Sequence, residues 1–286
     1  TDNGAVRFNG ASFTAFTVET GSLRDNEVWA LREDDEGGLW IGTYGGGVTL
    51  LKNGRFTTFT RADGLPDDMI RKLDKDPEGN IWIATPRGVG RYSRGSFAKF
   101  TAKDGLSHDF VTAIGAGTAG VFVATDTILH RYEGGRFVVV DGAVERGHGR
   151  INDLLCGHDG SLWMSFENAV VKRLKDGKLT TYTRKRNLSP GVSHLYEDPE
   201  GTLWVASPRG LRRLRDGKFE QLPSQDSRTN LGVVYCLCAD REGSLWVGLE
   251  SNGLARLRIN QLRTLTVEDG LPSDSTRSVF QDSQGN

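Results

Sequence analysis

The sequence predicts an all-β fold, a seven-bladed β-propeller made of four-stranded antiparallel blades. Three observations lead to this prediction: one block of sequence recurs about every 41 residues, each period holds four short apolar segments, and turn-forming residues separate those segments. A fixed period of about 40–50 residues is typical of architectures in which each period forms one structural unit. We therefore expect a single propeller domain over residues 1–286, with about seven repeats. It would be a fragment of a longer chain, because Thr1 is not a natural start.

The recurring block consists of an acidic turn, a glycine, an aliphatic residue, a tryptophan and a small residue. It reads Asp-Pro-Glu-Gly-Asn-Ile-Trp-Ile-Ala-Thr at 76–85 and Asp-Pro-Glu-Gly-Thr-Leu-Trp-Val-Ala-Ser at 198–207. We expect the aromatic residue to fill the wedge between blades, and the small residue two positions later to let the blades approach near the axis. The aromatic residues are Trp40, Trp82, Phe122, Trp163, Trp204 and Trp246, and the small ones are Gly42, Ala84, Ala124, Ser165, Ala206 and Gly248.

Each period divides into four segments that read as strands. An aliphatic pair three residues apart, such as Val28 and Leu31, comes first, and the tryptophan block follows it. The third segment alternates apolar and polar residues, as at 211–214, and the fourth reads Gly-x-Phe-x-x-Phe-Thr, as at 54–60. Four strands joined by short turns leave no room for a helix in 41 residues, and sheets this small must stack on one another. Radial stacking gives a propeller, and an extended β-solenoid is the alternative.

The number of blades follows from counting the segments separately. The fourth segment occurs seven times but the tryptophan block only six times. Residues 1–8 resemble the third segment of another repeat, and residues 282–286 resemble the turn before a tryptophan strand. We therefore expect the N-terminal and C-terminal ends to share one blade, which closes the ring and leaves few free edges.

Composition argues against several classes of partner. The chain has 36 basic and 37 acidic residues, spread evenly, which gives no electrostatic footprint for nucleic acid or an anionic membrane. No apolar run reaches the length of a membrane span, so we expect no direct membrane insertion by this segment. The three cysteines, Cys156, Cys236 and Cys238, are interpreted as small buried hydrophobic residues, with a redox or metal role as the alternative. We expect neither a cofactor nor a metal.

Catalytic motifs are not apparent. The five histidines show no metal-ligand spacing, and there is no nucleophile elbow, phosphate loop or calcium loop. The Asp-x-x-Gly sequences recur once per period, so we interpret them as turns rather than as calcium ligands. We therefore expect that this segment is not an enzyme.

The candidate ligand site lies in loops that vary between repeats while the frame repeats. One set follows the tryptophan strand and the other precedes the aliphatic pair, and in a four-stranded meander both lie at the same end of the sheet. We expect them to ring one mouth of the channel and to bind a small polar ligand, a sugar or a peptide. The alternative is that these residues are ordinary solvated residues at the tips of loops. The candidates are Tyr44, Arg87, Asp126, Glu167, Asn168, Arg209, Glu250 and Asn252 in the first set, and Asp68, His108, Arg150, Asn152 and Ser193 in the second.

The repeat resembles a known family. Asp-Gly-Leu-Pro at 63–66 and 269–272, followed by the aliphatic pair, the Asp-x-x-Gly turn and Trp-Ile-Gly-Thr at 40–43, is similar to the two-component regulator propeller repeat. The resemblance covers essentially the whole chain, and the block around Phe122 departs from it. It shares no fixed ligand residues with that family, so no site is carried over.

The resemblance implies a ligand-sensing, extracytoplasmic module of a membrane-bound signalling receptor. Such a module is periplasmic and tethered to the inner membrane through the parent chain, which is a histidine kinase, a hybrid kinase or a diguanylate cyclase. A homodimer formed through the parent receptor would fit the same plan. Two alternatives are a structural or protein-interaction propeller and a lyase-like enzyme that uses His108 and His194 at the channel mouth.

Overall fold

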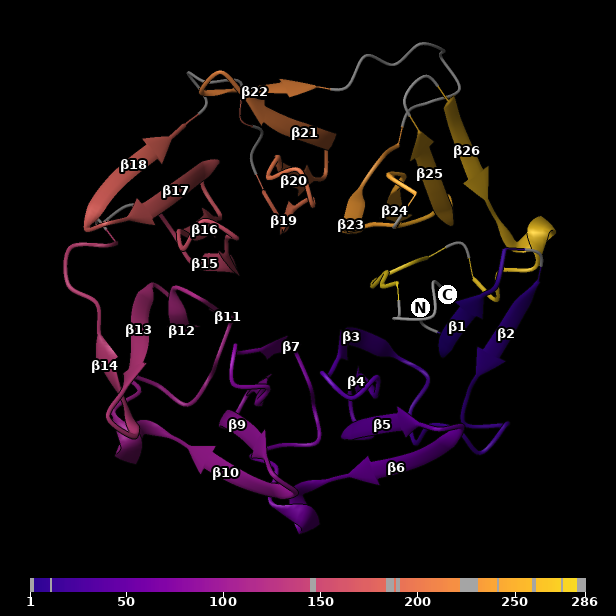
Figure 1. The fold of residues 1–286 in the computed structure, drawn as a ribbon, viewed down its shortest axis with the longest axis horizontal. Helices are drawn as coiled ribbons and strands as arrows, with labels where there is room; N and C mark the ends of the chain where they lie inside the picture. Colours follow the sequence, from indigo (N-terminus) through magenta and orange to yellow (C-terminus); the bar gives the residue numbers. More distant parts are fainter. Residues whose placement is uncertain are drawn as a thin grey trace.

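Every sheet of the structure pairs strands that are consecutive in the chain and antiparallel. The computed structural model describes residues 3–10, 12–144, 148–183, 188, 191–221, 231–240, 242–258, 261–273 and 275–281. The sheets surround one axis, and the chain passes from each sheet to the next around the ring (Figure 1). In each four-stranded sheet the first strand lies nearest the axis and the fourth lies at the rim. The predicted propeller of four-stranded antiparallel units is therefore confirmed.

Six sheets have four strands each and are numbered here as blades 1 to 6. Blade 1 contains β3 (Val28–Glu33), β4 (Leu39–Thr43), β5 (Val48–Lys52) and β6 (Arg55–Phe59). Blade 2 contains β7 (Lys72–Lys75), β8 (Ile81–Thr85), β9 (Gly88–Ser93) and β10 (Ser96–Phe100). Blade 3 contains β11 (Ala113–Gly117), β12 (Gly120–Thr125), β13 (Ile128–Glu133) and β14 (Arg136–Val139).

The second half of the ring repeats this plan. Blade 4 contains β15 (Ile151–Cys156), β16 (Leu162–Phe166), β17 (Val170–Lys175) and β18 (Lys178–Tyr182). Blade 5 contains β19 (His194–Glu197), β20 (Leu203–Ser207), β21 (Gly210–Arg215) and β22 (Lys218–Gln221). Blade 6 contains β23 (Val234–Ala239), β24 (Leu245–Leu249), β25 (Leu254–Arg258) and β26 (Gln261–Leu265).

The prediction of seven four-stranded blades, one shared between the two ends, is wrong. The described residues form six such blades and one two-stranded sheet, in which β1 (Ala5–Phe8) pairs with β2 (Phe13–Phe16) between blades 6 and 1 (Figure 1). Residues 275–281 lie beside that sheet but form no strand. In every blade a second strand bonds to both the first and the third, and the described residues here include no such strand. The turn expected at 282–286 lies outside the described residues, as do residues 1 and 2.

The Asp-Gly-Leu sequences form short 3-10 turns between blades, namely η1 (Arg61–Asp63), η2 (Ala102–Asp104) and η4 (Val267–Asp269). At η2 the Thr101 side chain and the Asp104 carboxylate form a reciprocal capping box. Gly105 follows with φ of 99°, and a Cβ there would lie 2.0 Å from the carbonyl oxygen of Phe137 in blade 3. Glycine is therefore required by both the left-handed backbone and the close approach of the next blade.

The hydrophobic core lies between neighbouring blades, as the wedge prediction requires. Trp82 of blade 2 is 1% exposed and belongs to one cluster with Ile114 and Phe137 of blade 3. A Cβ added to Gly42 of blade 1 would lie 2.5 Å from Cγ2 of Ile70, which begins the inner part of blade 2. The position two after the tryptophan is small because the next blade comes into contact there.

The recurring acid at the turn fixes the tryptophan of its own blade. In blade 2 the Trp82 Nε1 donates to Asp76 at 2.6 Å, and the same carboxylate accepts the backbone N–H of Asn80 at 2.8 Å. The same bond joins Trp40 to Asp34, Trp204 to Asp198 and Trp246 to Asp240. Blade 3 departs on both sides of the pair, because Phe122 has no N–H to donate and Ala116 stands where the acid would be.

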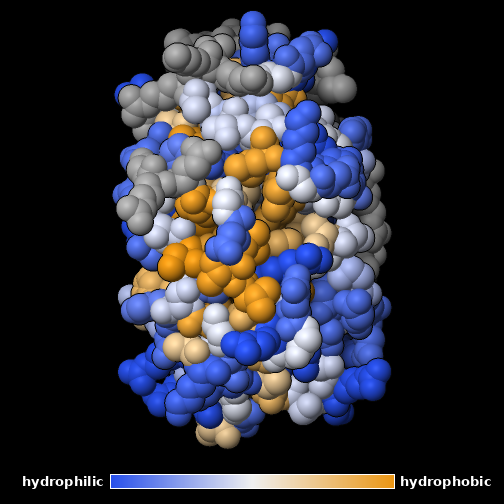
Figure 2. Space-filling view, turned by 90° about the vertical axis from the view of Figure 1, so that its left-hand side faces the viewer, coloured by the Kyte–Doolittle hydropathy of each residue, from blue (hydrophilic) through white to orange (hydrophobic). Residues whose placement is uncertain are grey.

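One side of the ring is apolar at its centre and polar toward its edges (Figure 2). Figure 2 looks at the side that carries β14 and β18 and shows apolar residues gathered at its centre. Among the exposed large hydrophobic side chains, Ile128 begins β13 and Val139 ends β14. Across the described ranges, no helix is long and apolar enough to cross a membrane.

Candidate functional site at one end of the ring axis

The two predicted sets of loops meet at the end of the axis where the first strands begin, which we call the mouth. Backbone hydrogen bonds join the loops directly. Tyr44 N donates to Glu27 O at 2.9 Å, Glu167 N donates to Arg150 O at 3.0 Å, and Ile151 N donates to Asp126 O at 2.9 Å. The frame therefore fixes each variable loop beside the start of a first strand.

Aromatic and cationic side chains gather on one side of the mouth. The Arg71 guanidinium carbon lies 5.8 Å from the ring centroid of Trp29 and 5.1 Å from that of Phe110. The Trp29 ring also contacts Tyr44, with centroids 4.9 Å apart, and the Arg277 guanidinium at 5.5 Å. We call Trp29, Tyr44, Arg71, Phe110, Arg150 and Arg277 the mouth cluster.

The backbone at the start of the first strand determines which side chains reach the mouth. Trp29 is the extra residue of a β-bulge between Val28 and Ala30, and Asn152 and Tyr235 occupy the same bulge in blades 4 and 6. Bulges redirect a side chain out of the regular alternation of a strand. Arg71 holds the equivalent position directly before β7, where its backbone N–H donates to Ala84 O at 2.9 Å.

The charge on Arg71 is poorly compensated. Its Nε is buried without a hydrogen-bond partner among the described residues, and its side chain makes no ion pair with them. Burial lowers the pKa of Arg71, the neighbouring Arg150 lowers it further, and Tyr44 acts in the opposite direction. The nearby carboxylate of Glu27 is already engaged by Arg277 at 3.4 Å and by Trp29 Nε1 at 3.1 Å.

Most of the other predicted site residues serve the frame. Asp68 accepts the backbone N–H of Arg61 at 2.7 Å, and His108 Nδ1 accepts that of Phe110 at 3.0 Å. Arg87 pairs with Asp67 at 3.0 Å. These contacts hold turns together, so the side chains of Asp68, His108 and Arg87 are already engaged within the fold.

The remaining predicted residues are distributed around the mouth. Asn152 donates to Val192 O at 3.1 Å, and Glu250 accepts from the Tyr235 hydroxyl at 2.7 Å. Ser193 Oγ donates to Val234 O at 3.2 Å. Asp126, Glu167, Asn168, Arg209 and Asn252 are exposed in their loops. Of the predicted set, only Tyr44 and Arg150 belong to the mouth cluster.

Sequence reasoning missed Trp29, Arg71, Phe110 and Arg277, although a signal for them was present. The residue directly after the first aliphatic of each pair varies from repeat to repeat while its neighbours keep their type. Across the repeats this position holds Trp29, Arg71, Thr112, Asn152, Ser193, Tyr235 and Arg277. Extending the prediction of Asn152 and Ser193 to this whole register would have found three of the four.

A second charged cluster lies deeper, on the first strands, and we call Lys72, Asp153 and His194 the axial clasp. Lys72 Nζ pairs with Asp153 Oδ1 and donates to Leu154 O at 2.8 Å. His194 Nδ1 lies 3.1 Å from Asp153 Oδ2, which also accepts the Leu195 N–H at 2.9 Å. The contacts link blades 2, 4 and 5.

The buried charge of Asp153 is compensated within the axial clasp. Burial opposes the ionisation of Asp153, which is 3% exposed. Lys72 and His194 nevertheless hold the pKa of that carboxyl well below its ordinary value. Each oxygen of the carboxylate has partners of its own, so the arrangement is one of structural cross-linking rather than of an available acid or base.

The cysteines are free thiols. Burial raises the pKa of both Cys156 and Cys236 to about 12, and that of Cys238 to about 11. Thiols with such values are poor nucleophiles near neutral pH, because the thiolate is the reactive form.

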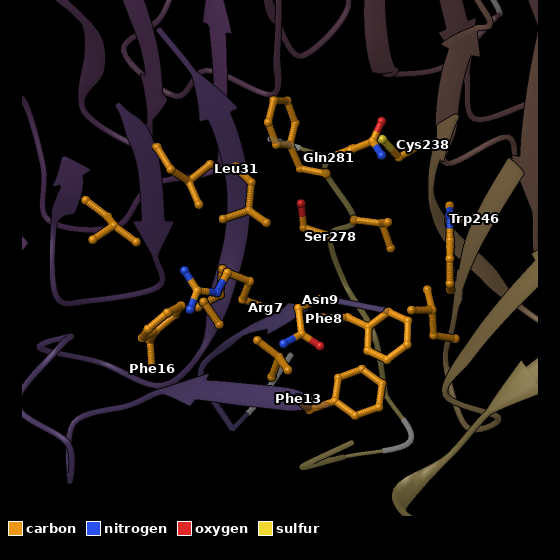
Figure 3. A pocket seen from close by; sticks show the side chains of 18 of the residues that line it. Arg7, Phe8, Asn9, Phe13, Phe16, Leu31, Cys238, Trp246, Ser278 and Gln281 are labelled. Atoms are coloured by element: carbon orange, nitrogen blue, oxygen red, sulfur yellow. The ribbon is translucent and has the colours of Figure 1, made fainter. Parts of the chain in front are cut away.

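A cavity of about 600 Å³ lies between β1 and residues 276–281 (Figure 3). Its lining includes Phe8, Leu31, Leu39 and Trp246. It separates the counterparts of a first and a third strand, where the other blades place their second strand. The lining is therefore that of a blade interior, and it contains none of the predicted site residues.

Comparison with known proteins agrees with this architecture. Residues 22–45, 64–87, 188–209 and 229–251 match the sequence profile of the family described as two component regulator propeller. Each matched segment ends at the strand of the tryptophan block or just after it. The chain carries the repeat of this family, as the resemblance predicted. No curated relative matches the chain with significance.

Solved structures with a similar fold include extracellular domains of two-component systems and a lyase. The extracellular domain described as that of the hybrid two component system BT3049 from B. thetaiotaomicron has a TM-score of 0.74 and 22% identity over 91% of this chain. The corresponding domain of BT4673 has a TM-score of 0.70 and 18% identity over 90% of this chain. This chain spans 38% of the length of each. A streptogramin B lyase has a TM-score of 0.74 and 17% identity, with 92% of this chain and 90% of the lyase covered.

Proposed function

We propose that this propeller is the ligand-sensing, extracytoplasmic module of a membrane-bound two-component receptor, with the ligand bound at the mouth cluster. The family repeat supports the signalling context. The observation that carries the ligand site is the half-buried Arg71, held between Trp29 and Phe110 with no acid partner among the described residues. A desolvated, unpaired cation costs stability unless a ligand compensates it.

The location of the module is part of the same proposal. The two hybrid-system neighbours are described as extracellular domains. We infer that this propeller is periplasmic and is tethered to the inner membrane through its parent chain, a histidine kinase, a hybrid kinase or a diguanylate cyclase. A homodimer formed through the parent would bring two such modules together. The ligand is a small polar molecule, a sugar or a peptide.

Signalling through such a module requires a difference in affinity between two arrangements. The mouth cluster draws on blades 1, 2, 3 and 4 and on the segment that carries Arg277. A ligand that contacts several blades would favour the arrangement in which they are drawn together. That shift would change the placement of the elements that lead toward the membrane.

The full-length parent receptor tests the proposal. Deleting residues 1–286 should leave its output unresponsive to the inducing ligand, and replacing Arg71 and Tyr44 should weaken the response while the protein remains folded. A receptor that responds to its inducer equally well without the propeller would contradict the proposed function.

Two other functions compete with a sensor. A lyase-like enzyme has the fold similarity to streptogramin B lyase in its favour. However, His194 is held by Asp153 and His108 accepts a backbone N–H within its own turn. Replacing both histidines by glutamine should leave ligand binding intact if the protein is a sensor. A protein-interaction propeller would instead show binding that depends on the apolar side wall of Figure 2.

A further inference from the structure

We propose that the mouth cluster recognises a carboxylate, held by Arg71 and Arg150, on a ligand whose flat or apolar face lies against Trp29 and Phe110. This proposal rests on the proposed function, because it specifies the ligand of the same site. It narrows that ligand from any polar molecule to an acidic one, either an acidic sugar or a molecule with a peptide-type terminal carboxylate.

The first argument is the absence of a counter-charge. Arg150 is close enough to Arg71 to lower the pKa of Arg71, yet neither side chain has an ion-pair or hydrogen-bond partner among the described residues. Glu27 is occupied by Arg277 and Trp29, and the Glu167 carboxylate beside Gly149 makes no ion pair with either arginine among the described residues. Two guanidinium groups that pair with no acid among the described residues can form a site for an oxyanion.

The second argument is the orientation of the donors. The Arg71 guanidinium is half-buried between two aromatic rings, so its position is defined before any ligand arrives. Arg150 stands directly before β15 and is exposed, so it is free to approach a ligand from the solvent side. A planar guanidinium forms paired hydrogen bonds with a carboxylate and adds geometric specificity to charge attraction.

The third argument comes from other arginines whose guanidinium groups also lie over aromatic rings. Arg131 lies over the Phe122 ring at 5.7 Å, but it pairs with Glu133 at 3.2 Å. Arg256 lies over Trp246 at 5.0 Å and pairs with Asp240 at 3.1 Å. These two arginines on aromatic rings are balanced by acids. Arg91, which lies over Trp82, instead donates to the Tyr132 hydroxyl at 3.0 Å, whereas the Arg71 side chain has neither kind of partner among the described residues.

Calorimetric titration tests the proposal with two matched pairs of probes. N-acetyltyrosine is compared with its amide, and digalacturonate with digalactose. At least one carboxylate member should bind about tenfold or more tightly than its uncharged counterpart, because charge-assisted hydrogen bonds carry the difference. Which pair responds separates a peptide-type ligand from an acidic sugar.

Two variants show whether Arg71 carries the preference. Arg71→Met should abolish the difference between charged and uncharged probes, while Arg131→Met, the same change at a balanced arginine, should preserve it. Without ligand, Arg71→Met should not lower the melting temperature, because it removes an uncompensated cation. A destabilised Arg71→Met protein would show that the cation is balanced within the fold.

Other results of the titration would overturn the carboxylate proposal. If no carboxylate probe binds at millimolar concentration, or if each binds no better than its uncharged partner, the carboxylate proposal is overturned. Equal binding of an uncharged probe at the mouth would leave the sensor function standing. Loss of the sensor function would appear separately, as a receptor whose response does not depend on residues 1–286.

Discussion

Two adjacent residues, Arg71 and Lys72, carry the same charge into opposite surroundings. Lys72 reaches the buried Asp153 of blade 4, where every charged group of the axial clasp has a partner. Arg71 turns toward the mouth, where its neighbours are two aromatic rings and a second guanidinium. The balanced network cross-links the ring, whereas the poorly compensated Arg71 is the basis of the proposed ligand site.

Removing Lys72 should have the largest effect on stability. Lys72→Met leaves the buried carboxylate of Asp153 with His194 as its remaining side-chain partner among the described residues, so the free energy of unfolding should fall by about 3 kcal/mol. Urea unfolding followed by tryptophan fluorescence measures the change. Lys75→Met is the matched control, because the Asp35 partner of Lys75 is 60% exposed, and a surface pair contributes only about 0–1 kcal/mol. Equal effects of the two variants would show that the clasp has no special role.

Neutralising both partners should restore part of that loss. In Lys72→Met with Asp153→Asn, no buried carboxylate remains uncompensated, and the asparagine oxygen can still accept the Leu195 N–H. We expect the double variant to be about 1–2 kcal/mol more stable than Lys72→Met alone. The same urea titration measures it. A double variant less stable than both single variants would show that packing, not charge, dominates at Asp153.

The stability that the axial clasp contributes should depend on pH. Because the folded pKa of Asp153 lies below its ordinary value, ionisation of this group stabilises the fold at pH above about 4. The contribution is lost as the pH falls through the ordinary aspartate pKa toward the folded one. The melting temperature of the native protein should therefore fall more steeply below about pH 4 than that of the double variant. Parallel curves for the two proteins would argue against this assignment.

The regular part of the fold was predictable because it repeats. The spacing of Trp40, Trp82, Trp204 and Trp246 indicated the units, and the structure adds that each indole is held by the acid six residues earlier. The small residue at Gly42 was predicted from the same register and is explained by the approach of Ile70. Local pattern and global packing agree at these positions, so the structure of one repeat predicts that of the others.

The blade count failed for a different reason. The pattern placed residues 1–8 and the end of the chain in one four-stranded unit, but pairing requires a second strand between them. Among the described residues β1 pairs with β2 alone. Segment counting identifies which strand types are present, whereas a four-stranded sheet depends on hydrogen-bond partners on both sides of its middle strands.

The functional clusters were harder to predict because they depend on the ring rather than on the repeat. The register of the clasp holds Ala30, Lys72, Ala113, Asp153, His194 and Cys236, which looks like unpatterned variation in the sequence. Only closure of the ring brings Lys72 and Asp153 together across 81 residues. Loop topology predicted that the variable loops meet at one end of the axis, where backbone hydrogen bonds join them. Most loop residues there hold turns, and the proposed ligand contacts come instead from Trp29, in a β-bulge, and from Arg71, directly before β7.

The smallest expected effect is a change in ligand affinity when the acid paired with Arg277 is neutralised. Glu27→Gln removes the acid that balances Arg277 but keeps a side chain able to accept the Trp29 N–H. The net positive charge of the mouth would then rise by one unit, and the carboxylate probe that binds the native protein should bind about two- to fivefold more tightly. The gain should shrink in high salt, since exposed charges are screened there. Weaker binding in Glu27→Gln would mean that Glu27 contacts the ligand itself, and the mouth would then favour a ligand of mixed charge over a simple acid.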